Sequence, residues 1–486
     1  MPPAVPVAVP PWEELAARVR GELTRSAGSL ARVRGDGSHL RGDPGGLLTP
    51  ADPEDVVEAV RWARRHGIGV VARGAGTSLD GESVPATGSL VVEFTGWDRV
   101  LEIDVEERLV RVQPGVVNHR LQEELRGHGL FFPPNPGSWR SSTLGGNAAT
   151  NASGPRSLKY GPTRRWVRGW EAVLGDGERL RAERRAPKRS AGPDLVGLLV
   201  GSEGTLGIFT ELLLEVAPLP EVRQAVVVPL PGVSEAVPAA RAILRGPKRC
   251  PAVSALEFVD ATVAGLLHEI PPGRLPAGRP LLLIELESRE RSRGEDLAEL
   301  AAALAGLGLD GEAIEFPNAD EMWTLRGESG LALDRAYGER IREDVAVPLG
   351  AVGQLFQEID RIAEELGVPL YTFAHLGEGS LHPNFVVDPA SPTAERIRRE
   401  LFDVVHRLGG TLSGEHGIGS LKAPYFELEH GRAGAEALER IRQQFDPDGI
   451  LNPGKLYPRR SAPAGEGAPP HARSPSVAAD GRTPPA

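Results

Sequence analysis

The spacing of apolar and polar positions changes near residue 217. Before that point, short apolar runs predict strands at 69–72, 90–94, 100–105 and 109–113. Apolar positions at helical spacing predict helices at 12–25, from Asp52 onward and at 117–127. Asp52 and Pro53 are favoured N-cap and first-turn residues of a helix, and Asp176-Gly177 is typical of a tight hairpin.

A linker, A-P-L-P-E-V at 217–222, opens a second region in which strands and helices alternate. Its apolar runs predict strands at 224–230, 281–287 and 345–347. Its helical periodicity predicts helices at 234–245, 294–306 and 354–366, and a final helix at 393–408. This alternation indicates an α+β second domain.

Residues 131–154 have neither a helical nor a strand period. They are rich in Pro, Gly, Ser, Thr and Asn, yet they include apolar residues of the kind found in protein interiors. A loop this long inside a compact domain is usually functional or disordered. The apolar residues favour an ordered, functional loop.

Length and charge limit the class of protein. A chain of 486 residues is too long for one ordinary core, so two or three domains are expected. The net charge of −11 opposes binding to nucleic acid. No apolar run approaches the ~18 residues of a membrane span, and the proline-rich N-terminus lacks the features of a signal peptide. We therefore expect a cytoplasmic protein with no transmembrane segment and no nucleic-acid partner.

The chain has one cysteine, Cys250. One thiol excludes an intrachain disulfide, a C-x-x-C redox pair and a four-cysteine zinc site. It also excludes an iron–sulfur cluster held by this chain alone. If the protein moves electrons, they must leave through another cofactor or another polypeptide.

Three loops combine glycines with hydroxyl residues, at 73–78, 143–151 and 201–208. Successive backbone N–H groups in such loops form a concavity that binds anions, although turn formation alone also explains a single loop. The first loop lacks the full dinucleotide fingerprint, and no P-loop is present. Together, the three loops can surround a long ligand that carries a pyrophosphate and a flat ring.

Two histidines, His375 and His382, lie seven residues apart. This spacing does not place both rings on one helical face, and in a regular strand they would point to opposite sides. The rings converge only if the backbone between them turns, which Gly377 and Gly379 permit.

A second segment carries the adjacent pair Glu415 and His416. Two imidazoles and one carboxylate are a plausible ligand set for a divalent metal that leaves room for substrate. His416 would then be free to act as a base. A lone histidine is more often an ordinary buried or solvated side chain, but this constellation favours a site.

Eight motifs match a known family in order along the chain. They are R-G-A-G-T-S-L at 73–79, P-N-P-G-S at 134–138, S-T-L-G-G-N at 142–147, N-A-S-G-P-R-S-L-K-Y-G at 151–161, G-S-E-G-T-L-G-I at 201–208, H-x-G-x-G-x-x-H-P at 375–383, S-G-E-H-G-I-G at 413–419 and F-D-P-D-G-I-L-N-P-G-K at 445–455. They resemble the FAD-binding oxidoreductases of the vanillyl-alcohol oxidase / para-cresol methylhydroxylase fold. The chain is most similar to the branch that holds the glycolate oxidase D subunit, D-lactate dehydrogenase and D-2-hydroxyglutarate dehydrogenase.

The resemblance runs from about residue 48 to 457 and implies an α+β architecture with a two-lobed FAD-binding domain and a substrate (cap) domain. The expected organisation is an N-terminal arm and helix at 1–47, the FAD-binding domain at 48–217, the cap domain with the metal site at 222–420, a C-terminal segment returning to the FAD domain at 421–457 and a disordered tail at 458–486.

The resemblance implies that FAD is bound by the glycine loops and their neighbours. The expected contacts are Arg73, Gly74, Ala75, Gly76, Thr77, Ser78, Pro136, Ser138, Thr143, Gly146, Asn147, Ser153, Gly154, Tyr160, Glu203, Gly204, Thr205, Ile208 and Asn452. The loops place no evident nucleophilic His or Cys beside the flavin methyl, so we expect the FAD to be non-covalent.

By family pattern, His375, His382 and Glu415 hold a divalent metal, with zinc expected and manganese or iron as alternatives. His416 is then the base. Arg326 holds the substrate carboxylate and Arg342 supplies a second cation. The alternative for each arginine is a surface ion pair; the substrate role is favoured for Arg326 and left open for Arg342. The chain departs from the family pattern at Glu378, Ser380, Gly330 and Arg342. These departures leave the identity of the substrate open.

The implied activity is the oxidation of a small D-2-hydroxy acid, of the D-lactate, glycolate or D-2-hydroxyglutarate class, to the 2-oxo acid. The C2 hydrogen would pass as hydride to flavin N5, with metal assistance and a His base. The electrons would leave to an electron-transfer flavoprotein, quinone, cytochrome or iron–sulfur subunit, and a homodimer is compatible with the family. The alternatives are a flavin subunit of a multi-subunit glycolate or lactate oxidase and a non-redox alkylglycerone-phosphate-synthase-like transferase.

Overall fold

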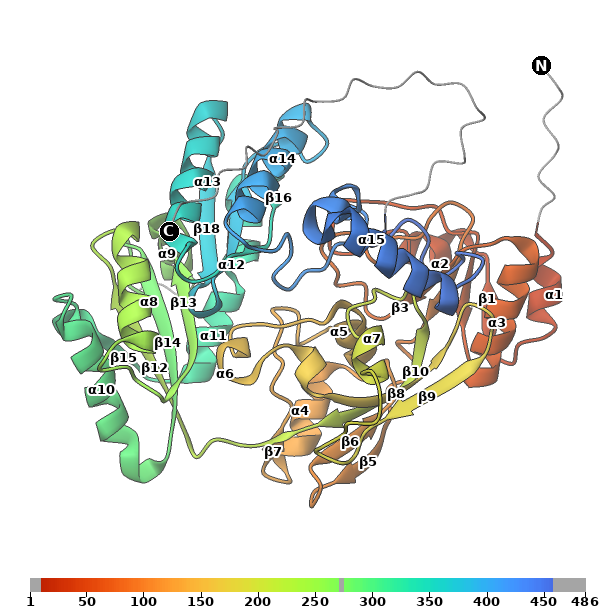
Figure 1. The fold of residues 1–486 in the computed structure, drawn as a ribbon, viewed down its shortest axis with the longest axis horizontal. Helices are drawn as coiled ribbons and strands as arrows, with labels where there is room; N and C mark the ends of the chain where they lie inside the picture. Colours follow the sequence, from red (N-terminus) through yellow and green to blue (C-terminus); the bar gives the residue numbers. More distant parts are fainter. Residues whose placement is uncertain (1–9, 271–274, 458–486) are drawn as a thin grey trace, which may run out of the picture.

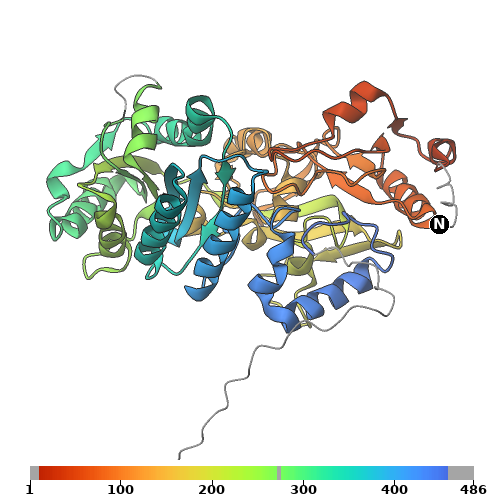
Figure 2. The ribbon, with the colours of Figure 1, turned by 90° about the horizontal axis from the view of Figure 1, so that it is seen from above.

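The computed structural model describes residues 10–270 and 275–457. The tail that was predicted to be disordered, 458–486, and the first nine residues of the N-terminal arm lie outside the described residues. Figure 1 shows two lobes side by side, and Figure 2 shows them from above. The first lobe contains three sheets within residues 10–218, one of them only two-stranded, and the second contains one large sheet within 222–407. The predicted α+β class is confirmed.

The first sheet of the first lobe has the strand order β1-β2-β4-β3. Its strands are β1 (Glu22–Thr24), β2 (Gly46–Thr49), β4 (Leu90–Glu93) and β3 (Val70–Arg73). The helix predicted from Asp52 is confirmed as α3 (Pro53–His66), and the Asp52 carboxylate accepts hydrogen bonds from the first-turn N–H groups. The α3 face toward the sheet buries Val56, Val60 and Trp62.

The helix predicted at 12–25 is wrong in its second half. Helix α1 (Trp12–Ala16) is short, and strand β1 follows it. The N–H groups of Arg20 and Gly21 bond the Asp55 carboxylate of α3 at 2.8 and 2.7 Å. This long-range contact turns the chain into β1 and interrupts the helical period. The short helix α2 (Ala27–Arg32) follows.

The second sheet is antiparallel, with the order β5-β6-β10-β8-β9. Its strands are β5 (Val100–Asp104), β6 (Leu109–Val112), β10 (Ile208–Glu215), β8 (Val167–Val173) and β9 (Arg179–Glu183). The hairpin predicted at Asp176-Gly177 joins β8 to β9. Helix α4 (Asn118–Arg126) confirms the prediction at 117–127. Strand β7 (Leu130–Phe131) pairs with β11 (Ala217–Pro218).

The segment 131–154, predicted to be a loop, contains helix α5 (Leu144–Thr150). Thr143 caps this helix by accepting a hydrogen bond from the N–H of Gly146. Its sequence L-G-G-N-A-A-T has few apolar residues, so no helical period is visible. Two further short helices, α6 (Ser157–Tyr160) and α7 (Leu195–Leu199), complete the lobe.

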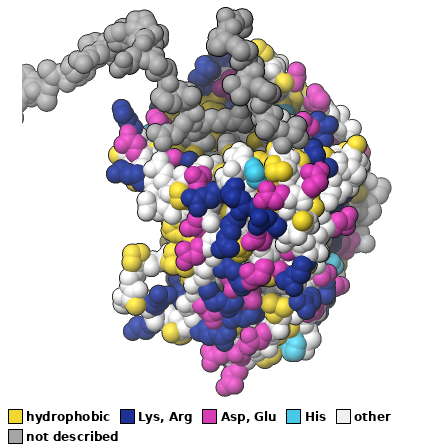
Figure 3. Space-filling model, turned by 90° about the vertical axis from the view of Figure 1, so that its right-hand side faces the viewer, with side chains coloured by type: hydrophobic (Ala, Val, Ile, Leu, Met, Phe, Trp, Pro, Cys, Tyr) yellow, Lys and Arg dark blue, Asp and Glu magenta, His cyan; other side chains and the backbone are white. Residues whose placement is uncertain are grey.

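Charged side chains of both signs are interleaved on the side of the molecule that carries α1, α3 and β9 (Figure 3). On β9, Arg179 and Arg181 bond Glu171 of β8 at 2.8 and 3.0 Å. Such partly exposed pairs contribute little to stability individually. Because acidic and basic groups alternate there, this side presents charges of both signs.

The second lobe is built on an eight-stranded sheet with the order β15-β12-β14-β13-β18-β19-β16, and β17 also pairs with β19. Its strands are β12 (Val222–Pro229), β13 (Val253–Val259), β14 (Leu281–Ser288), β15 (Ile314–Phe316), β16 (Ile341–Arg342), β17 (Val345–Ala346), β18 (Leu370–His375) and β19 (Ser380–Phe385). Its helices are α8 (Ala236–Arg245), α9 (Ala261–His268), α10 (Arg293–Ala305), α11 (Ala319–Gly327), α12 (Ser329–Tyr337), α13 (Val352–Leu366) and α14 (Pro392–Arg407). The predicted strands and helices of this region are therefore confirmed, within a few residues at their ends.

The helices of the second lobe cover both faces of its sheet. The largest apolar core lies between one face and helices α8, α10, α13 and α14. A smaller core lies between the other face and helices α9, α11 and α12. Burial on both sides explains why the central strands β13 and β14 are mostly apolar; their polar residues are three glutamates and two serines.

The chain then returns to the first lobe. Helix α15 (Phe426–Phe445) follows the helix predicted to be the last, so that prediction is wrong. Gly431 breaks the regularity of α15, and only Phe426 and Ala435 are buried, which leaves a weak apolar period. Leu451 then bridges to Val70 of β3. None of the helices in the described ranges is both long and apolar enough to cross a membrane.

Candidate active site

A cavity of about 610 Å³ lies between the two lobes. Its first-lobe wall consists of the loops at 74–79, 135–139 and 203–204 with helix α5. Its second-lobe wall consists of side chains from α11, α12, β18 and β19 and from the segment at 415–416. The glycine loops and the histidine group that the sequence singled out therefore line the same cavity.

The loop after β3 approaches the start of helix α5 closely, which explains why glycines are needed in the first wall. Strand β3 ends at Arg73, whose buried guanidinium bonds Ser83, and the chain turns at Gly76 with a φ of +68°. A Cβ at Gly74 would stand 2.2 Å from Oγ1 of Thr143, the residue that caps α5. A side chain at position 74 would therefore disturb the cap of the neighbouring helix.

Most residues expected to contact FAD line the cavity. They are Gly74, Ala75, Gly76, Thr77, Ser78, Pro136, Ser138, Thr143, Gly146, Asn147, Glu203, Gly204 and Asn452. The others of that set lie outside the lining: Arg73, Ser153, Gly154, Tyr160, Thr205 and Ile208. The Tyr160 hydroxyl instead donates a hydrogen bond to Glu287 of the second lobe.

The first wall fits a long polar cofactor. Besides the backbone groups of the loops, it carries buried polar atoms with no hydrogen-bond partner among the described residues. These are Nδ2 of Asn147, Oδ1 of Asn452 and Oε1 of Glu82. Because buried polar groups are normally satisfied, these atoms indicate a polar ligand. Glu82 was missed in the sequence because its motif, S-L-D-G-E-S, resembles an ordinary polar turn.

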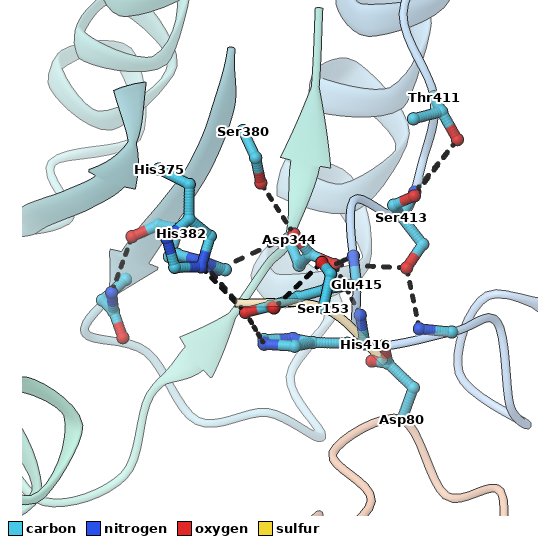
Figure 4. Close-up of polar contacts among 12 residues, drawn as sticks. Asp80, Ser153, Asp344, His375, Ser380, His382, Thr411, Ser413, Glu415 and His416 are labelled. Carbon is cyan, nitrogen blue, oxygen red and sulfur yellow. Dashed lines mark hydrogen bonds and ion pairs between the residues drawn. The ribbon is translucent and has the colours of Figure 1, made fainter. Parts of the chain in front are cut away.

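The second wall carries a group of possible metal ligands, His375, His382 and Glu415 (Figure 4). One donor atom from each lies within 4.8 Å of the others. Nε2 of His375 is 3.0 Å from Oε1 of Glu415, and Nε2 of His382 is 3.6 Å from the same oxygen. Two imidazoles and a carboxylate at such distances fit a divalent cation.

A tight connection between two strands brings the two histidines together. His375 ends β18, and His382 lies on the neighbouring strand β19, opposite Phe373. Gly379 has a φ of +80°, and a Cβ there would stand 2.1 Å from the carbonyl oxygen of Val347. The predicted turn therefore depends on Gly379.

Buried carboxylates behind this group fix its geometry. Glu257 of β13 contacts Nδ1 of His375 at 2.7 Å. Asp344 accepts hydrogen bonds from the backbone N–H groups of Glu415 and His416 at 2.6 and 2.8 Å. Such carboxylates hold ligating residues in position. Both were missed: Glu257 is a single charge in the apolar strand V-S-A-L-E-F-V, which was the available signal, and nothing local distinguishes Asp344.

The charges of this cluster depress the pKa values of its carboxylates. Burial would raise the pKa of Glu415, but His375 and the other imidazoles lower it to about 2. Burial would likewise raise the pKa of Asp344, but His416, His382 and Lys422 hold it well below its usual range. Burial, reinforced by the charge of His375, lowers the pKa of His382 to about 3. A neutral His382 beside ionised carboxylates has the protonation state that a metal ligand requires.

His416 lies beside the group without completing it. Its ring stacks on that of His382, with centroids 5.1 Å apart, and its Nε2 is 4.0 Å from Glu415. Its Nδ1 is buried and has no hydrogen-bond partner among the described residues. A free ring nitrogen in the cavity can accept a proton.

The two arginines differ in how their charge is compensated. Arg326 of α11 is buried and lies over the ring of Phe373, 4.5 Å from its centroid. Its Nη2 is 2.8 Å from Oε2 of Glu257 but forms no hydrogen bond, and Nε also lacks a partner among the described residues. Arg342 is more exposed and bonds Asp334 at 2.6 Å. Both line the cavity, and Arg326 has donors left for a ligand.

Family profiles match both parts of the chain. The profile of the FAD binding domain matches residues 44–183, and that of FAD linked oxidases, C-terminal domain, matches residues 219–456.

Three related proteins cover nearly the whole chain. Glycolate oxidase subunit GlcD of Bacillus subtilis is 34% identical over 425 residues, 85% of this chain and 89% of its own length. D-2-hydroxyglutarate dehydrogenase of Stutzerimonas stutzeri is 31% identical over 455 residues, 90% and 96% of the two chains. D-lactate dehydrogenase of Archaeoglobus fulgidus is 32% identical over 413 residues, 84% and 90% of the two chains.

Solved structures show the same fold at lower identity. A 4-ethylphenol oxidase from Gulosibacter chungangensis has a TM-score of 0.75 and 20% identity, covering 92% of this chain and 97% of its own. A p-cresol methylhydroxylase has a TM-score of 0.75 and 16% identity, covering 93% and 96%.

Proposed function

The chain belongs to the FAD-linked oxidases of the vanillyl-alcohol oxidase / p-cresol methylhydroxylase fold, in the branch of the 2-hydroxy-acid dehydrogenases, and from this we propose that it oxidises a small D-2-hydroxy acid to the 2-oxo acid. One observation carries the proposal: the His375, His382 and Glu415 group, the free His416 and the donors of Arg326 line the same cavity as the glycine loops.

Arg326 and His416 have separate tasks in this proposal. The guanidinium of Arg326 donates hydrogen bonds to the substrate carboxylate, which places C2 between the two walls. A ring nitrogen of His416 accepts the proton of the C2 hydroxyl. Arg342 supports the carboxylate through its positive charge, which Asp334 partly compensates.

Two bound groups complete the chemistry. FAD, held without a covalent bond by the first wall, supplies the acceptor for the C2 hydrogen and its electron pair. A divalent metal held by His375, His382 and Glu415 supplies a positive charge that favours loss of the hydroxyl proton. Zinc suits the two nitrogen donors and one oxygen donor, and manganese and iron are the alternatives.

Glu257 links these tasks. One of its oxygens contacts His375 at 2.7 Å and the other lies 2.8 Å from Arg326. The same buried carboxylate therefore positions a metal ligand and the carboxylate-binding arginine. This arrangement supports a substrate that carries its hydroxyl and carboxylate on adjacent carbons.

The acceptor of the electrons lies outside this chain, since the one cysteine cannot hold a cluster. We propose an electron-transfer flavoprotein, a quinone, a cytochrome or an iron–sulfur subunit. The similarity to a protein named as a glycolate oxidase subunit favours a second candidate, in which this chain is the flavin subunit of a larger oxidase.

Anaerobic bleaching of the flavin tests the proposal. The purified chain is mixed with D-lactate, glycolate, D-2-hydroxyglutarate and the L-enantiomers of the chiral acids. We expect rapid bleaching by one D-acid or glycolate and slow bleaching by the L-acids. A flavin that no 2-hydroxy acid reduces would contradict the proposal. Bleaching without turnover on artificial acceptors would favour the subunit candidate.

A further inference from the structure

A second buried acidic group lies on the first wall of the cavity, apart from the proposed metal ligands. It consists of Glu82, Glu203 and the amide of Asn452, whose exposed fractions are 4%, 5% and 3%. Nδ2 of Asn452 donates hydrogen bonds to the backbone carbonyls of Glu82 and Glu203 at 2.9 and 2.6 Å. Oε1 of Glu82 and Oδ1 of Asn452 have no partner among the described residues. Two residues that line the cavity therefore each carry a buried oxygen without a partner.

The two carboxyl groups are close to each other. If Gly417 carried a Cβ, that atom would stand 2.6 Å from Oε1 of Glu82 and 2.8 Å from Oε1 of Glu203. The nearby cation Lys422 pairs with Asp80 at 3.1 Å and acts on Glu203 only through its charge. Two buried like charges so close together do not both ionise at neutral pH.

Hydrogen bonding shows which group keeps its charge. The carboxylate of Glu203 accepts backbone N–H groups from Ile418 and Gly419 at 2.7 and 2.9 Å. Glu82 accepts one bond, from the N–H of Asp80 at 3.1 Å, through Oε2. Glu203 is thus the better stabilised anion, and Glu82 is the better site for a shared proton.

The electrostatic surroundings agree with this assignment. Burial, and then the charges of Glu203 and Asp80, raise the pKa of Glu82 well above its usual value, and Asp36 acts in the same direction. Burial raises the pKa of Glu203 to about 7, and the two backbone N–H groups and Lys422 limit that rise. Tyr457 is a further titratable group near Glu203.

We propose that Glu82 is a neutral carboxylic acid that shares one proton with ionised Glu203, and that this one-proton pair forms part of the cavity wall against which FAD binds. FAD offers oxygen and nitrogen acceptors on its phosphates, ribityl chain and ring, and an ionised Glu82 would repel them. The proposal rests on FAD occupying the cavity, and it does not depend on which acid is oxidised.

The consequence is a proton-linked affinity for FAD. The pair binds FAD best while it holds its one proton, so affinity is highest at low pH and falls as pH rises and the pair loses that proton. One linked proton weakens binding by up to about tenfold per pH unit above the titration.

The test measures the dissociation constant of FAD for the full-length protein after removal of its flavin, across neutral to alkaline pH. We expect the wild-type constant to rise with pH. Glu82→Gln keeps the shape of the side chain and cannot ionise, so its constant should stay flat across the same range. Glu106→Gln, at an exposed turn, is the matched control and should follow the wild type.

A wild-type constant independent of pH would overturn the proposal without any variant. A Glu82→Gln protein that folds, as judged by far-UV circular dichroism, and keeps the wild-type slope would also overturn it. No substrate is present in this measurement. If FAD binding depends on pH as expected but no hydroxy acid bleaches the flavin, this inference stands and only the proposed activity is contradicted.

Discussion

The two walls of the cavity are built in different ways. The first wall offers backbone N–H groups in glycine-containing loops, and its close contacts come from neighbouring segments such as Gly74 and Thr143. The second wall offers side chains, some of which are held by buried carboxylates from elsewhere in the sequence, as Glu257 holds His375. A backbone site needs room and the right turns. A site made of side chains also needs the distant residues that position them. Single substitutions should therefore impair individual functions of the second wall more selectively than those of the first wall.

The largest expected effect comes from substituting, in separate variants, the proposed base and a proposed metal ligand of the second wall. His416→Gln should slow reduction of the flavin by substrate by about 10²–10⁴-fold, because proton transfer is lost, while metal content stays near wild type. His375→Gln should lose both the rate and the metal. Stopped-flow reduction and elemental analysis measure the two effects.

FAD occupancy is the internal control for both variants, because the flavin loops belong to the other wall. Reversed metal contents would exchange the roles assigned to His375 and His416. Unchanged rates in both variants would remove the proposed site.

A substitution of Glu285 tests whether the contact between the lobes is as sensitive to a single substitution as the second wall. It is fully buried and bonds Arg156 at 3.1 Å, Arg223 at 3.0 Å and the indole of Trp323 at 2.6 Å. Glu285→Gln should lower the free energy of unfolding by about 3 kcal/mol near neutral pH, because it leaves buried arginine charge uncompensated. Urea unfolding measures this loss. Glu183→Gln, which weakens the partly exposed ion pairs with Arg111 and Arg185, should cost less than Glu285→Gln.

The difference between wild type and Glu285→Gln should depend on pH. Burial would raise the pKa of Glu285, but Arg156 and Arg223 lower it to about 2. A carboxyl group whose folded-state pKa is depressed stabilises the fold above its unfolded pKa of about 4, and that contribution is lost as pH falls toward 2. The two stabilities should therefore converge in acid. A constant difference at all pH values would mean that packing, and not charge, causes it.

Asp344→Asn tests the carboxylate behind the metal group. The amide oxygen can replace Oδ2, which accepts both N–H groups of Glu415 and His416, but the amide NH₂ cannot accept the hydroxyl of Ser380 as Oδ1 does. Because the negative charge is lost as well, metal affinity should fall by about 10–100-fold. Competition with a chelator measures the change. Glu343→Gln is the neighbouring control, because its carboxylate bonds Arg398 at 2.9 Å and should leave metal affinity nearly unchanged. Equal losses in both variants would indicate general destabilisation.

The smallest effect concerns the turn between the two histidines. Gly379→Ala should cost about 2 kcal/mol and weaken metal binding, because its φ of +80° is strained for alanine and the new Cβ meets the carbonyl of Val347. Gly377→Ala would meet the flexible side chain of Leu158 and should cost less. Thermal unfolding and metal content compare the two. Equal costs would show that the turn does not depend on the left-handed conformation.

The features that were predictable from the sequence are local. The α+β class, the α3 cap at Asp52, the hairpin at Asp176-Gly177 and the glycine loops follow from periods and turn chemistry that neighbouring residues determine. The histidine group was also visible, because two glycine-rich segments carry its members.

The features that were missed depend on contacts between distant residues. The helix predicted at 12–25 ends early because Asp55 of α3 binds the backbone at Arg20 and Gly21. Glu257 and Asp344 acquire their roles only when β13 and the segment before β17 meet the histidines. Helix α5 has too few apolar residues to show a period. The hydrogen bond between Tyr160 and Glu287 across the join between the lobes was likewise not visible in the sequence.

That join also bears on attempts to exchange substrate specificity between relatives. The linker at 217–222 resembles a convenient place to cut the gene and graft a different second lobe. However, Arg156, Lys159 and Tyr160 of the first lobe bond Glu285 and Glu287 of the second, and residues after α14 return to β3. A chimaera cut only at the linker would bury mismatched charges at this seam. A transplant should therefore carry the 151–161 segment together with its glutamate partners.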